Sequence, residues 1–375
     1  MKPRRSSAHG RHVTEICADH AIALRMQSLL LAGNPGTTPL EIVDWFGAMQ
    51  AQDISSGKWS IGVRLDKGTE TEVDQAIESG EILRTWPMRG TIHFIAGRDA
   101  RWMLATTGAR ALKGVARRWE SLGLDEYTCN RAAEILANSL SKTPTSRSDI
   151  IRLLTNSGID VTGQRAYHML WYSSQIGVAC IGPNIGKEQS FVLLEEFAPP
   201  GDEREYEAAI AELANRYFRS HGPALQSDFA GWAGITITDA KRGIAALGDD
   251  YSTVIVDGTA MIVNAELLET GPVAPDPDAM HLLAGFDEFI LGFKNRDLVL
   301  PASFKNHIVP GGNGIFRPTV VDGGRVTGTW SRTIKPTSVA VKVEPFVKHT
   351  KKQQTKINRA ARDFGHYLGK EVSIT

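Results

Sequence analysis

The most unusual polar residues of this chain are two glutamines, Gln50 and Gln52, in the segment Ala48–Met49–Gln50–Ala51–Gln52–Asp53. Residues two apart share a face only where the chain is extended or turning, because in a helix they point in different directions. Two primary amides side by side supply acceptor oxygens and NH2 donors that can hold a water or a base edge in place. The residues alone favour a plainer interpretation, a polar helix end whose amides are satisfied.

A second polar group follows in Arg84–Ile95, a segment that predicts a strand. In an extended chain Arg89, Thr91 and His93 point to one face, and this row of donors could meet phosphates. A solvated strand face explains the pattern equally well. Basic residues also gather in two further stretches, each either a solvated helix face or a set of phosphate contacts: Arg110, Lys113, Arg117 and Arg118, and Lys348, Lys351, Lys352, Lys356, Arg359 and Arg362.

Motifs of the common cofactor and metal enzymes do not occur in the sequence. There is no Gly-x-Gly-x-x-Gly after a strand, no P-loop and no Gly-x-Ser-x-Gly elbow. The glycines of Gly311–Gly314 fit a hairpin turn better than a phosphate cradle. The ten histidines form no His-x-x-x-His pair, and Cys17–Ala18–Asp19–His20 lacks the second half of a zinc site. We therefore expect neither a metal nor a cofactor.

Composition narrows the class of protein. The 375 residues include 42 Lys plus Arg and 42 Asp plus Glu, so no global basic excess announces nucleic-acid binding, although a basic inner face within an acidic shell fits the same balance. Three widely spaced cysteines exclude a disulfide framework and fit a reducing cytosol. No apolar run approaches the ~18 residues of a membrane span, and no signal-peptide core follows Met1–His12. The composition predicts a soluble, cytoplasmic protein of several domains with no membrane association.

Three stretches share one order of predicted elements: a turn rich in Pro, Ser or Thr, a helix, a second turn, a second helix and a β-hairpin. Ser and Thr side chains can cap the helix starts, and acids there complement the helix dipole. The first helices open in 37–43, 144–151 and 223–230, the second helices cover 71–77, 162–174 and 238–246, and the hairpins cover 83–95, 178–194 and 251–263. This order is typical of tandem winged helices, although any mixed α+β domain can place helices before hairpins.

We expect an α+β fold of three tandem winged-helix domains and a C-terminal β-barrel-like domain. The expected parts are a flexible basic arm (1–12), an N-terminal helix from Val13 to Leu30 leading into the first winged helix (13–125), the second (126–200), the third (201–272) and a β-rich domain (279–375). In that last domain, short apolar runs between turns predict strands at 286–293, 299–300, 308–309, 315–321, 325–330 and 339–346, closed by a helix over 350–368.

Several of these residues occur together in a known superfamily. Gln50–Ala51–Gln52–Asp53 with Trp59, and Arg84–Thr85–Trp86 with Arg89–Gly90–Thr91–Ile92–His93, resemble the winged-helix DNA-binding-domain-containing superfamily. The phrases 286–296, 314–318 and 328–330 extend the resemblance over roughly Val13 to Leu368. The characterised members are the AlkZ-type (azinomycin-resistance) bacterial DNA glycosylases, which remove bulky alkylated bases and unhook interstrand crosslinks. The resemblance implies a C-shaped scaffold of three winged helices and a β-barrel that grips duplex DNA in its concave face.

The resemblance also implies a catalytic signature, which is Gln–aliphatic–Gln in one branch and Gln–aliphatic–Asp in the other. Gln50–Ala51–Gln52 matches the first, whereas Asp53 lies one position beyond the acid of the second. We therefore expect Gln50 and Gln52 to be catalytic. The candidate contacts to double-stranded DNA are Arg89, Thr91, His93, Arg117 and Arg118.

The chemistry of alkylated purines agrees with an amide pair. A purine alkylated at N7 is cationic and leaves without being protonated, so the protein must only place a water and stabilise positive charge on the sugar. Amides are weak bases, so unmodified bases should stay intact. The expected function is a monomeric, metal- and cofactor-independent DNA glycosylase acting on alkylated purines, with interstrand crosslinks as further candidate substrates. Two alternatives stay open: a non-enzymatic winged-helix regulator, and a binding module for RNA or protein.

Overall fold

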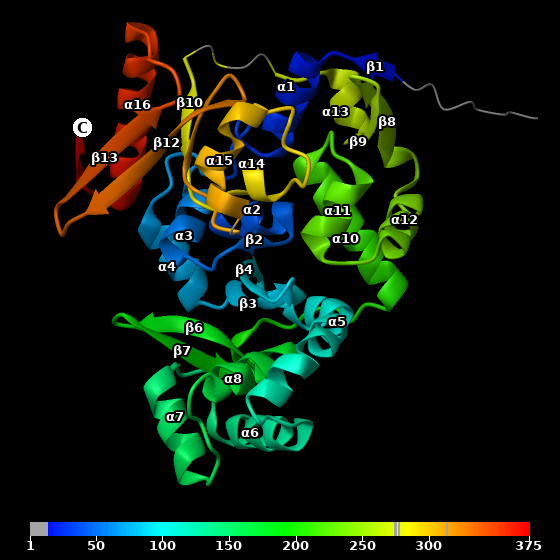
Figure 1. Cartoon of the computed structure of the whole chain (residues 1–375), viewed down its shortest axis with the longest axis vertical. Coiled ribbons are helices and arrows are strands. Elements are labelled where there is room, and N and C mark those ends of the chain that lie inside the picture. The colour runs from blue at the N-terminus through cyan, green and yellow to red at the C-terminus, as the bar shows by residue number, and fades with distance from the viewer. Residues whose placement is uncertain (1–13, 274–275, 277, 313) are drawn as a thin grey trace, which may run out of the picture.

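The structure is a computed structural model that describes residues 14–273, 276, 278–312 and 314–375 (Figure 1). It has a mixed α+β fold in which three groups of helices, each followed by a β-hairpin, precede a C-terminal β-rich unit. The flexible arm expected over residues 1–12 lies outside the described residues. The domain boundaries expected from the sequence stay a prediction.

The first group places the strand that carries Gln50. It consists of α2 (Pro39–Phe46), β2 (Met49–Gln50), α3 (Ile54–Gly62), α4 (Glu70–Glu78), β3 (Ile82–Met88) and β4 (Thr91–Ala96). Thr38 and Thr69 each begin a helix with a capping box, in which a Glu three residues later bonds back to the cap backbone. Arg89 and Gly90 form the β3–β4 turn with positive φ angles of 56° and 68°, as a tight hairpin turn requires.

The second group shares a sheet with the first. After η1 (Gly97–Asp99) and α5 (Ala100–Ser121), it consists of α6 (Glu126–Ser139), β5 (Thr145–Ser146), α7 (Arg147–Asn156), α8 (Arg165–Gln175), β6 (Ala179–Ile185) and β7 (Glu188–Leu193). Arg84 of β3 pairs with Ile181 of β6, so the two hairpins join into one antiparallel sheet in the order β2-β4-β3-β6-β7-β5. Figure 1 shows the two hairpins side by side.

The third group receives the N-terminal segment at its sheet edge. After α9 (Leu194–Phe197) come α10 (Tyr206–His221), α11 (Gln226–Ala233), α12 (Ile237–Ala245), η2 (Gly248–Asp250), β8 (Tyr251–Val256), β9 (Thr259–Asn264) and α13 (Ala265–Thr270). The start of the chain supplies β1 (Thr14–Ile16), which pairs parallel with β8, and then α1 (Ala18–Ser28). The prediction of a helix from Val13 onward is therefore wrong for Thr14–Ile16, because the open edge of β8 offers backbone partners that local periodicity does not reveal.

The C-terminal unit is a sheet that curls into a half-barrel, with β10 and β14 as its two edges in the order β10-β11-β12-β13-β14. Its elements are β10 (Met280–Leu283), α14 (Glu288–Leu291), η3 (Ala302–Phe304), α15 (Lys305–Ile308), η4 (Pro310–Gly312), β11 (Thr319–Asp322), β12 (Arg325–Ile334), β13 (Ser338–Pro345), α16 (Lys351–Leu368) and β14 (Glu371–Ile374). The helix expected over 350–368 is present as α16.

Three of the strands expected in the C-terminal unit are not strands. Residues 286–293 contain α14, whose first turn is capped by Asp287 accepting from the N–H of Phe289. Val299 and Leu300 lie in a turn, and Ile308 ends α15. Phe289, Val299, Leu300 and Ile308 of these runs are buried, and a short apolar run fits a buried helix or turn as well as a buried strand.

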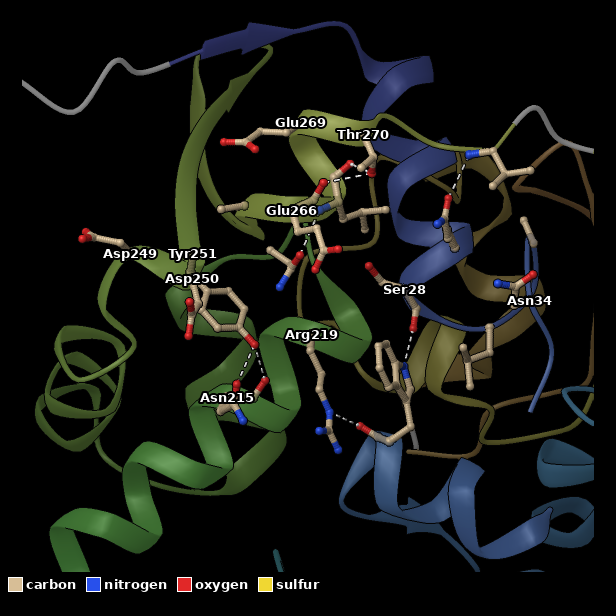
Figure 2. A pocket seen from close by; sticks show the side chains of 18 residues that line it. Ser28, Asn34, Asn215, Arg219, Asp249, Asp250, Tyr251, Glu266, Glu269 and Thr270 are labelled. Atoms are coloured by element: carbon tan, nitrogen blue, oxygen red, sulfur yellow. Dashed lines mark hydrogen bonds between the residues drawn. The ribbon is translucent and has the colours of Figure 1, made fainter. Parts of the chain in front are cut away.

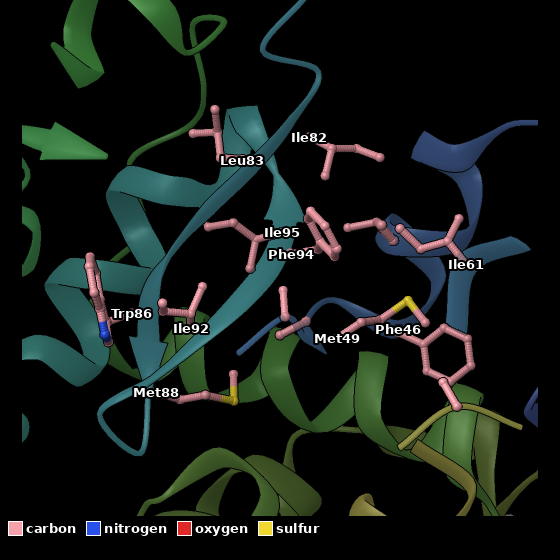
Figure 3. Packing of buried hydrophobic residues seen from close by; sticks show 14 of the residues in the cluster. Phe46, Met49, Ile61, Ile82, Leu83, Trp86, Met88, Ile92, Phe94 and Ile95 are labelled. Carbon is pink, nitrogen blue, oxygen red and sulfur yellow. The ribbon is translucent and has the colours of Figure 1, made fainter. Parts of the chain in front are cut away.

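One continuous hydrophobic cluster connects the three helical groups with the C-terminal unit. Figure 3 shows the part of it around the β3–β4 hairpin, where Met49 and Phe94 project among the same apolar side chains as Phe46. A buried ion pair crosses between units: Arg64, just beyond α3, binds Asp287 through two hydrogen bonds of 2.8 Å each. Such bidentate pairs are geometrically specific, so the segment before α14 is held in a fixed position relative to α3.

Candidate active site

Gln50 lies on a strand that the core holds in place. It ends β2, which pairs antiparallel with β4 so that Gln50 is opposite His93. Its neighbour Met49 is fully buried, and because side chains alternate along a strand, Gln50 is directed to the other face. The N–H of Ala51 donates to the carbonyl of Ile92 at 2.8 Å and continues the pairing past Gln50. The extended backbone that the glutamine spacing requires is therefore present.

Gln52 lies against the same part of β4 as Gln50. It follows in a bend, its side chain is exposed, and its amide oxygen accepts from the N–H of Ile92 at 3.3 Å. Asp53 has a different task, because its carboxylate accepts from the N–H of Ser56 at 3.1 Å and caps α3. The two amides are thus gathered at one place on β4, and the acid beside them is a structural cap.

The loop that carries the glutamines is held closely by its neighbours. A Cβ on Gly57 would lie 2.9 Å from Cε2 of Phe94 and 3.1 Å from the carbonyl oxygen of Gln50, so a larger residue would push α3 away from this loop. From β3, Nη2 of Arg84 donates to the carbonyl of Ala51 at 3.3 Å. Burial lowers the pKa of Arg84 to about 10 and the charge of Asp53 opposes that shift, so Arg84 stays cationic at neutral pH.

Half-buried Arg89 and fully buried His93 form a pair on the Gln50 face of β4. Nη2 of Arg89 lies 2.9 Å from Nε2 of His93, and Nδ1 of His93 lies 2.8 Å from the carbonyl oxygen of Thr91. Burial, assisted by the Arg89 charge, lowers the pKa of His93 to about 3, so its ring is neutral at pH 7. Nδ1 then donates to Thr91 and Nε2 accepts from Arg89. His93, a predicted DNA contact, is fully buried, and its Nε2 faces Arg89.

Three buried polar atoms at this place have no hydrogen-bond partner within the described part of the chain: Oε1 of Gln50, Nε of Arg89 and Oγ1 of Thr91. Buried polar atoms are nearly always paired, so a set of unpaired ones indicates a partner that the protein itself does not supply. An amide oxygen accepts, a guanidinium donates and a hydroxyl does both. Each of these atoms can therefore bind a water molecule or a polar atom of a ligand.

A buried carboxylate behind Gln50 was not identified as a site residue from the sequence. Glu288 of α14 is fully buried, and its Oε1 accepts from the backbone N–H of Gln50 at 3.4 Å. Its Oε2 accepts from Nε1 of Trp232 at 3.1 Å and lies 3.3 Å from Nε2 of His221. The partners come from β2, α10 and α11, and 238 residues separate Gln50 from Glu288, so no local spacing could pair them. The only available signal was an acid within an apolar run.

Opposite charges therefore lie around the amides, with Glu288 fully buried and Arg89 half-buried. Burial lowers the pKa of Arg89, and the charge of Glu288 opposes that shift. A low-dielectric surrounding makes such charges act strongly on anything bound between them. The other two predicted DNA contacts are Arg117 and Arg118, and Arg118 lines one cavity together with Arg89. Arg117 and Arg118 are exposed on α5, where Arg118 donates to Oε1 of Gln164 at 2.6 Å.

A cavity of ≈ 740 Å³ lies between α1, α10 and the β8–α13 segment, and neither glutamine lines it (Figure 2). Four acids surround it, Asp249, Asp250, Glu266 and Glu269, against the single cation Arg219, so phosphates would be repelled there. Among the residues described, no group of three or more His, Cys, Asp or Glu could hold a metal ion. No helix in the same ranges is long and apolar enough to cross a membrane.

Comparison with known proteins gives three consistent matches. A family model described as "DNA glycosylase AlkZ-like" matches residues 43–367. An interstrand DNA cross-link repair glycosylase of Streptomyces sahachiroi is 26% identical over 321 residues, covering 82% of this chain and 86% of that protein. The solved structure of the Streptomyces sahachiroi DNA glycosylase AlkZ covers 96% of this chain and 100% of its own, with a TM-score of 0.80 at 22% identity, which shows a shared fold.

Proposed function

The chain belongs to the AlkZ-like DNA glycosylase family, and from that premise we propose that it hydrolyses the N-glycosidic bond of alkylated, cationic purines in double-stranded DNA. It is a hydrolase of N-glycosyl bonds, so the open questions are the substrate and the residues that act on it. The observation that carries the proposal is the amide pair itself. Gln50 and Gln52 lie against Ile92 and His93 of β4, and the amide oxygen of Gln50 is buried without a partner.

The proposed reaction does not require these amides to act as an acid or a base. The bond from C1′ to N9 breaks, and its electron pair leaves with the base and neutralises the charge at the alkylated N7. The oxygen of a water then bonds to C1′, and the proton that it releases passes to solvent. Gln50 and Gln52 orient this water, and their carbonyl dipoles face the positive charge that develops on the sugar. Unmodified purines leave poorly as anions, so they are spared.

Glu288 is proposed as a positioning residue for this step. Its carboxylate fixes the backbone of Gln50, and the same negative charge lies close to the place where the sugar becomes cationic. Because Glu288 is fully buried, solvent screens its charge weakly. The Arg89–His93 pair fixes the opposite side of the site, and the Nε of Arg89 is free to donate to a phosphate or sugar oxygen.

We further infer that each helical group is a winged helix that contributes to DNA binding. In the first two groups the short first strand pairs with the last strand of the hairpin, in the orders β2-β4-β3 and β5-β7-β6. In the third group an isolated bridge between Ala224 and Ile262 takes the place of the short strand. These arrangements support three winged helices. The proposed DNA contacts are Arg89, Thr91, Arg117 and Arg118, with His93 acting through Arg89.

Crosslinked DNA is a further proposed substrate. The Streptomyces sahachiroi relative is named for interstrand cross-link repair. In this chain Gln52 is exposed and Gln50 is only half-buried, so the amides lie near the surface rather than at the bottom of a deep pocket. A base tethered to the opposite strand cannot swing freely out of the duplex, and a shallow site suits such a substrate.

The test is incubation of the protein with a duplex that carries one N7-methylguanine, followed by alkali and a denaturing gel. We expect strand scission at the modified position and none in the matched duplex with unmodified guanine. A crosslinked duplex in the same assay should release two separable strands. Tight binding to the duplex with no scission would overturn the enzymatic proposal and favour a non-enzymatic regulator.

A further inference from the structure

A second cavity, of ≈ 430 Å³, lies where the β3–β4 turn approaches α5 and α8. Its charged and aromatic lining comes from Arg89 of the turn, Arg110 and Arg118 of α5, and Tyr167, His168 and Trp171 of α8. No acidic residue is among the residues that line it. It is thus unlike the acid-lined cavity of Figure 2, and its volume is within the range of small-ligand sites.

The positive charges of this cavity are not neutralised by the protein. Arg110 is exposed, and within the described ranges it has neither a hydrogen bond nor an ion pair. Arg118 bonds to the neutral side chains of Gln164 and Ser121 rather than to an acid. Two guanidinium groups on one helix, neither paired with an acid, attract an anion, and the anion that DNA presents is a phosphate.

Beside these cations, α8 offers an aromatic surface and an unsatisfied polar atom. Tyr167 is 38% exposed and packs edge-on against His168, with ring centroids 5.3 Å apart. His168 is only 8% exposed, and its Nδ1 has no hydrogen-bond partner among the residues that the structure describes. Burial and the Arg118 charge lower the pKa of His168, so its ring is neutral and can serve as donor or acceptor. An exposed aromatic ring stacks on any nucleobase.

We propose that this cavity receives one undamaged nucleotide of the bound DNA, whose phosphate pairs with Arg110 and Arg118, whose base stacks on Tyr167, and whose base edge bonds to His168. The occupant is an undamaged base because the cavity has three arginines and no acid among its lining and would repel the cationic lesion, whereas at the amides the charge of Glu288 opposes that of Arg89. The site is linked to the amides through Arg89, which lines the cavity and also contacts His93, the residue opposite Gln50. This inference rests on the proposed function, since it requires bound DNA.

The experiment tests whether the loss of the Tyr167 side chain and the loss of one DNA base affect DNA affinity independently. A series of duplexes carries one N7-methylguanine, and each member lacks one neighbouring base, replaced by an abasic tetrahydrofuran. Their affinities are compared for the wild type, Tyr167→Ala and the control Tyr127→Ala, which removes a tyrosine that is 74% exposed on α6 and does not line the cavity. Thermal melting of each variant establishes that it is folded.

We expect Tyr167→Ala to weaken binding of the intact duplex by roughly 5–150-fold, the range for loss of one stacked base. At one position of the series that penalty should vanish, because the base that Tyr167 holds is already missing. Arg110→Gln should lower the slope of affinity against salt by about one phosphate contact.

A penalty that is equal at every position, or that Tyr127→Ala reproduces, would overturn the nucleotide pocket. If the proposed function is wrong but the nucleotide pocket is right, the result is different. The wild type then binds the duplexes and shows the position-dependent Tyr167 penalty, but alkali produces no strand scission. If the wild type binds none of the duplexes, both proposals are wrong.

Discussion

The backbone N–H of Gln50 and the carboxylate of Glu288 meet at 3.4 Å, although 238 residues separate them. The contact joins a strand of the first helical group to the short helix α14 of the C-terminal unit. The residue before Glu288 is Asp287, which Arg64 holds through two hydrogen bonds. Two neighbouring acids thus position α14 against α3 and β2, so the geometry of the amide site depends on how the C-terminal unit packs.

Removal of the amides should separate chemistry from binding. We expect Gln52→Ala and Gln50→Ala each to lower single-turnover excision by about 10²–10³, with little change in DNA affinity. The double variant should lose far less than the product of the two, because the amides act as a unit. Gln354→Ala, which removes an amide on α16, is the matched control. Wild-type rates in a well-folded double variant would end the catalytic assignment.

Glu288→Gln should slow excision through lost charge. The substitution keeps the shape of the side chain but removes the negative charge behind Gln50, so we expect at least about a tenfold lower excision rate at unchanged DNA affinity. The control is Asp228→Asn, since Asp228 is also buried and accepts backbone N–H groups of Leu225, Lys294 and Asn295 without touching Gln50. Both variants can lose stability, and only Glu288→Gln should lose rate at equal folded fraction. Equal rates in the two variants would show a merely structural role.

His93 should make the protein sensitive to mild acid. Its pKa is about 3 in the folded protein against an ordinary 6.5, so the unfolded chain takes up the proton first as the pH falls. Titration of His93 therefore leaves the free energy of unfolding unchanged above pH 6.5 and lowers it progressively as the pH falls from 6.5 toward 3. At pH 5 this single group lowers the free energy of unfolding by about 2 kcal/mol. Urea unfolding at pH 7.5 and pH 5 should therefore show a smaller acid loss in His93→Gln than in the wild type, with exposed His366→Gln as control.

Arg64→Met should destabilise the fold strongly, because it leaves the buried Asp287 without its partner. Such losses are typically about 3–5 kcal/mol. Burial would raise the pKa of Asp287, but the charge and hydrogen bonds of Arg64 outweigh it and hold the pKa below the ordinary 3.8. The ion pair therefore contributes its full stabilisation above pH 3.8. That stabilisation is lost as the pH falls through the lowered pKa of Asp287. The cost of Arg64→Met, measured by urea unfolding, should shrink at acidic pH, and a pH-independent cost would contradict this account.

DNA affinity should fall steeply with salt, because phosphate contacts release counterions. Arg117→Gln and Arg118→Gln should each reduce the slope of log affinity against log salt by about one, and equally for every sequence. Arg152→Gln on α7 is a fair control, since that arginine is exposed and already paired with Asp149. Unchanged slopes in both α5 variants would remove Arg117 and Arg118 from the DNA interface.

The sequence by itself determined the features that depend on near neighbours along the chain. The spacing of Gln50 and Gln52 places both amides on one face only where the chain is extended or turning. Turns rich in Pro, Ser or Thr with cap residues marked the starts of the three helical groups, and a helix was predicted over 350–368. Each of these depends on side-chain alternation, cap chemistry or helical periodicity, which operate over a few residues. The short apolar runs of the C-terminal unit were ambiguous for the same reason, since burial alone does not distinguish a strand from a short helix such as α14.

Only the tertiary structure decided what surrounds the amides. Glu288 reaches the backbone of Gln50, and Trp232 and His221 contact that carboxylate. The three residues come from elements that are close in space and distant from Gln50 in sequence. The burial of His93 likewise follows from packing. The alternating pattern of a strand predicts which residues share a face of β4, but it does not predict that other elements cover both faces. Pairing of Thr14–Ile16 with β8 and of β3 with β6 depends on strand edges that become available only when distant segments meet. Local propensities are weak compared with such long-range pairing and burial, so the chain alone specified the amides and the fold supplied their charged surroundings.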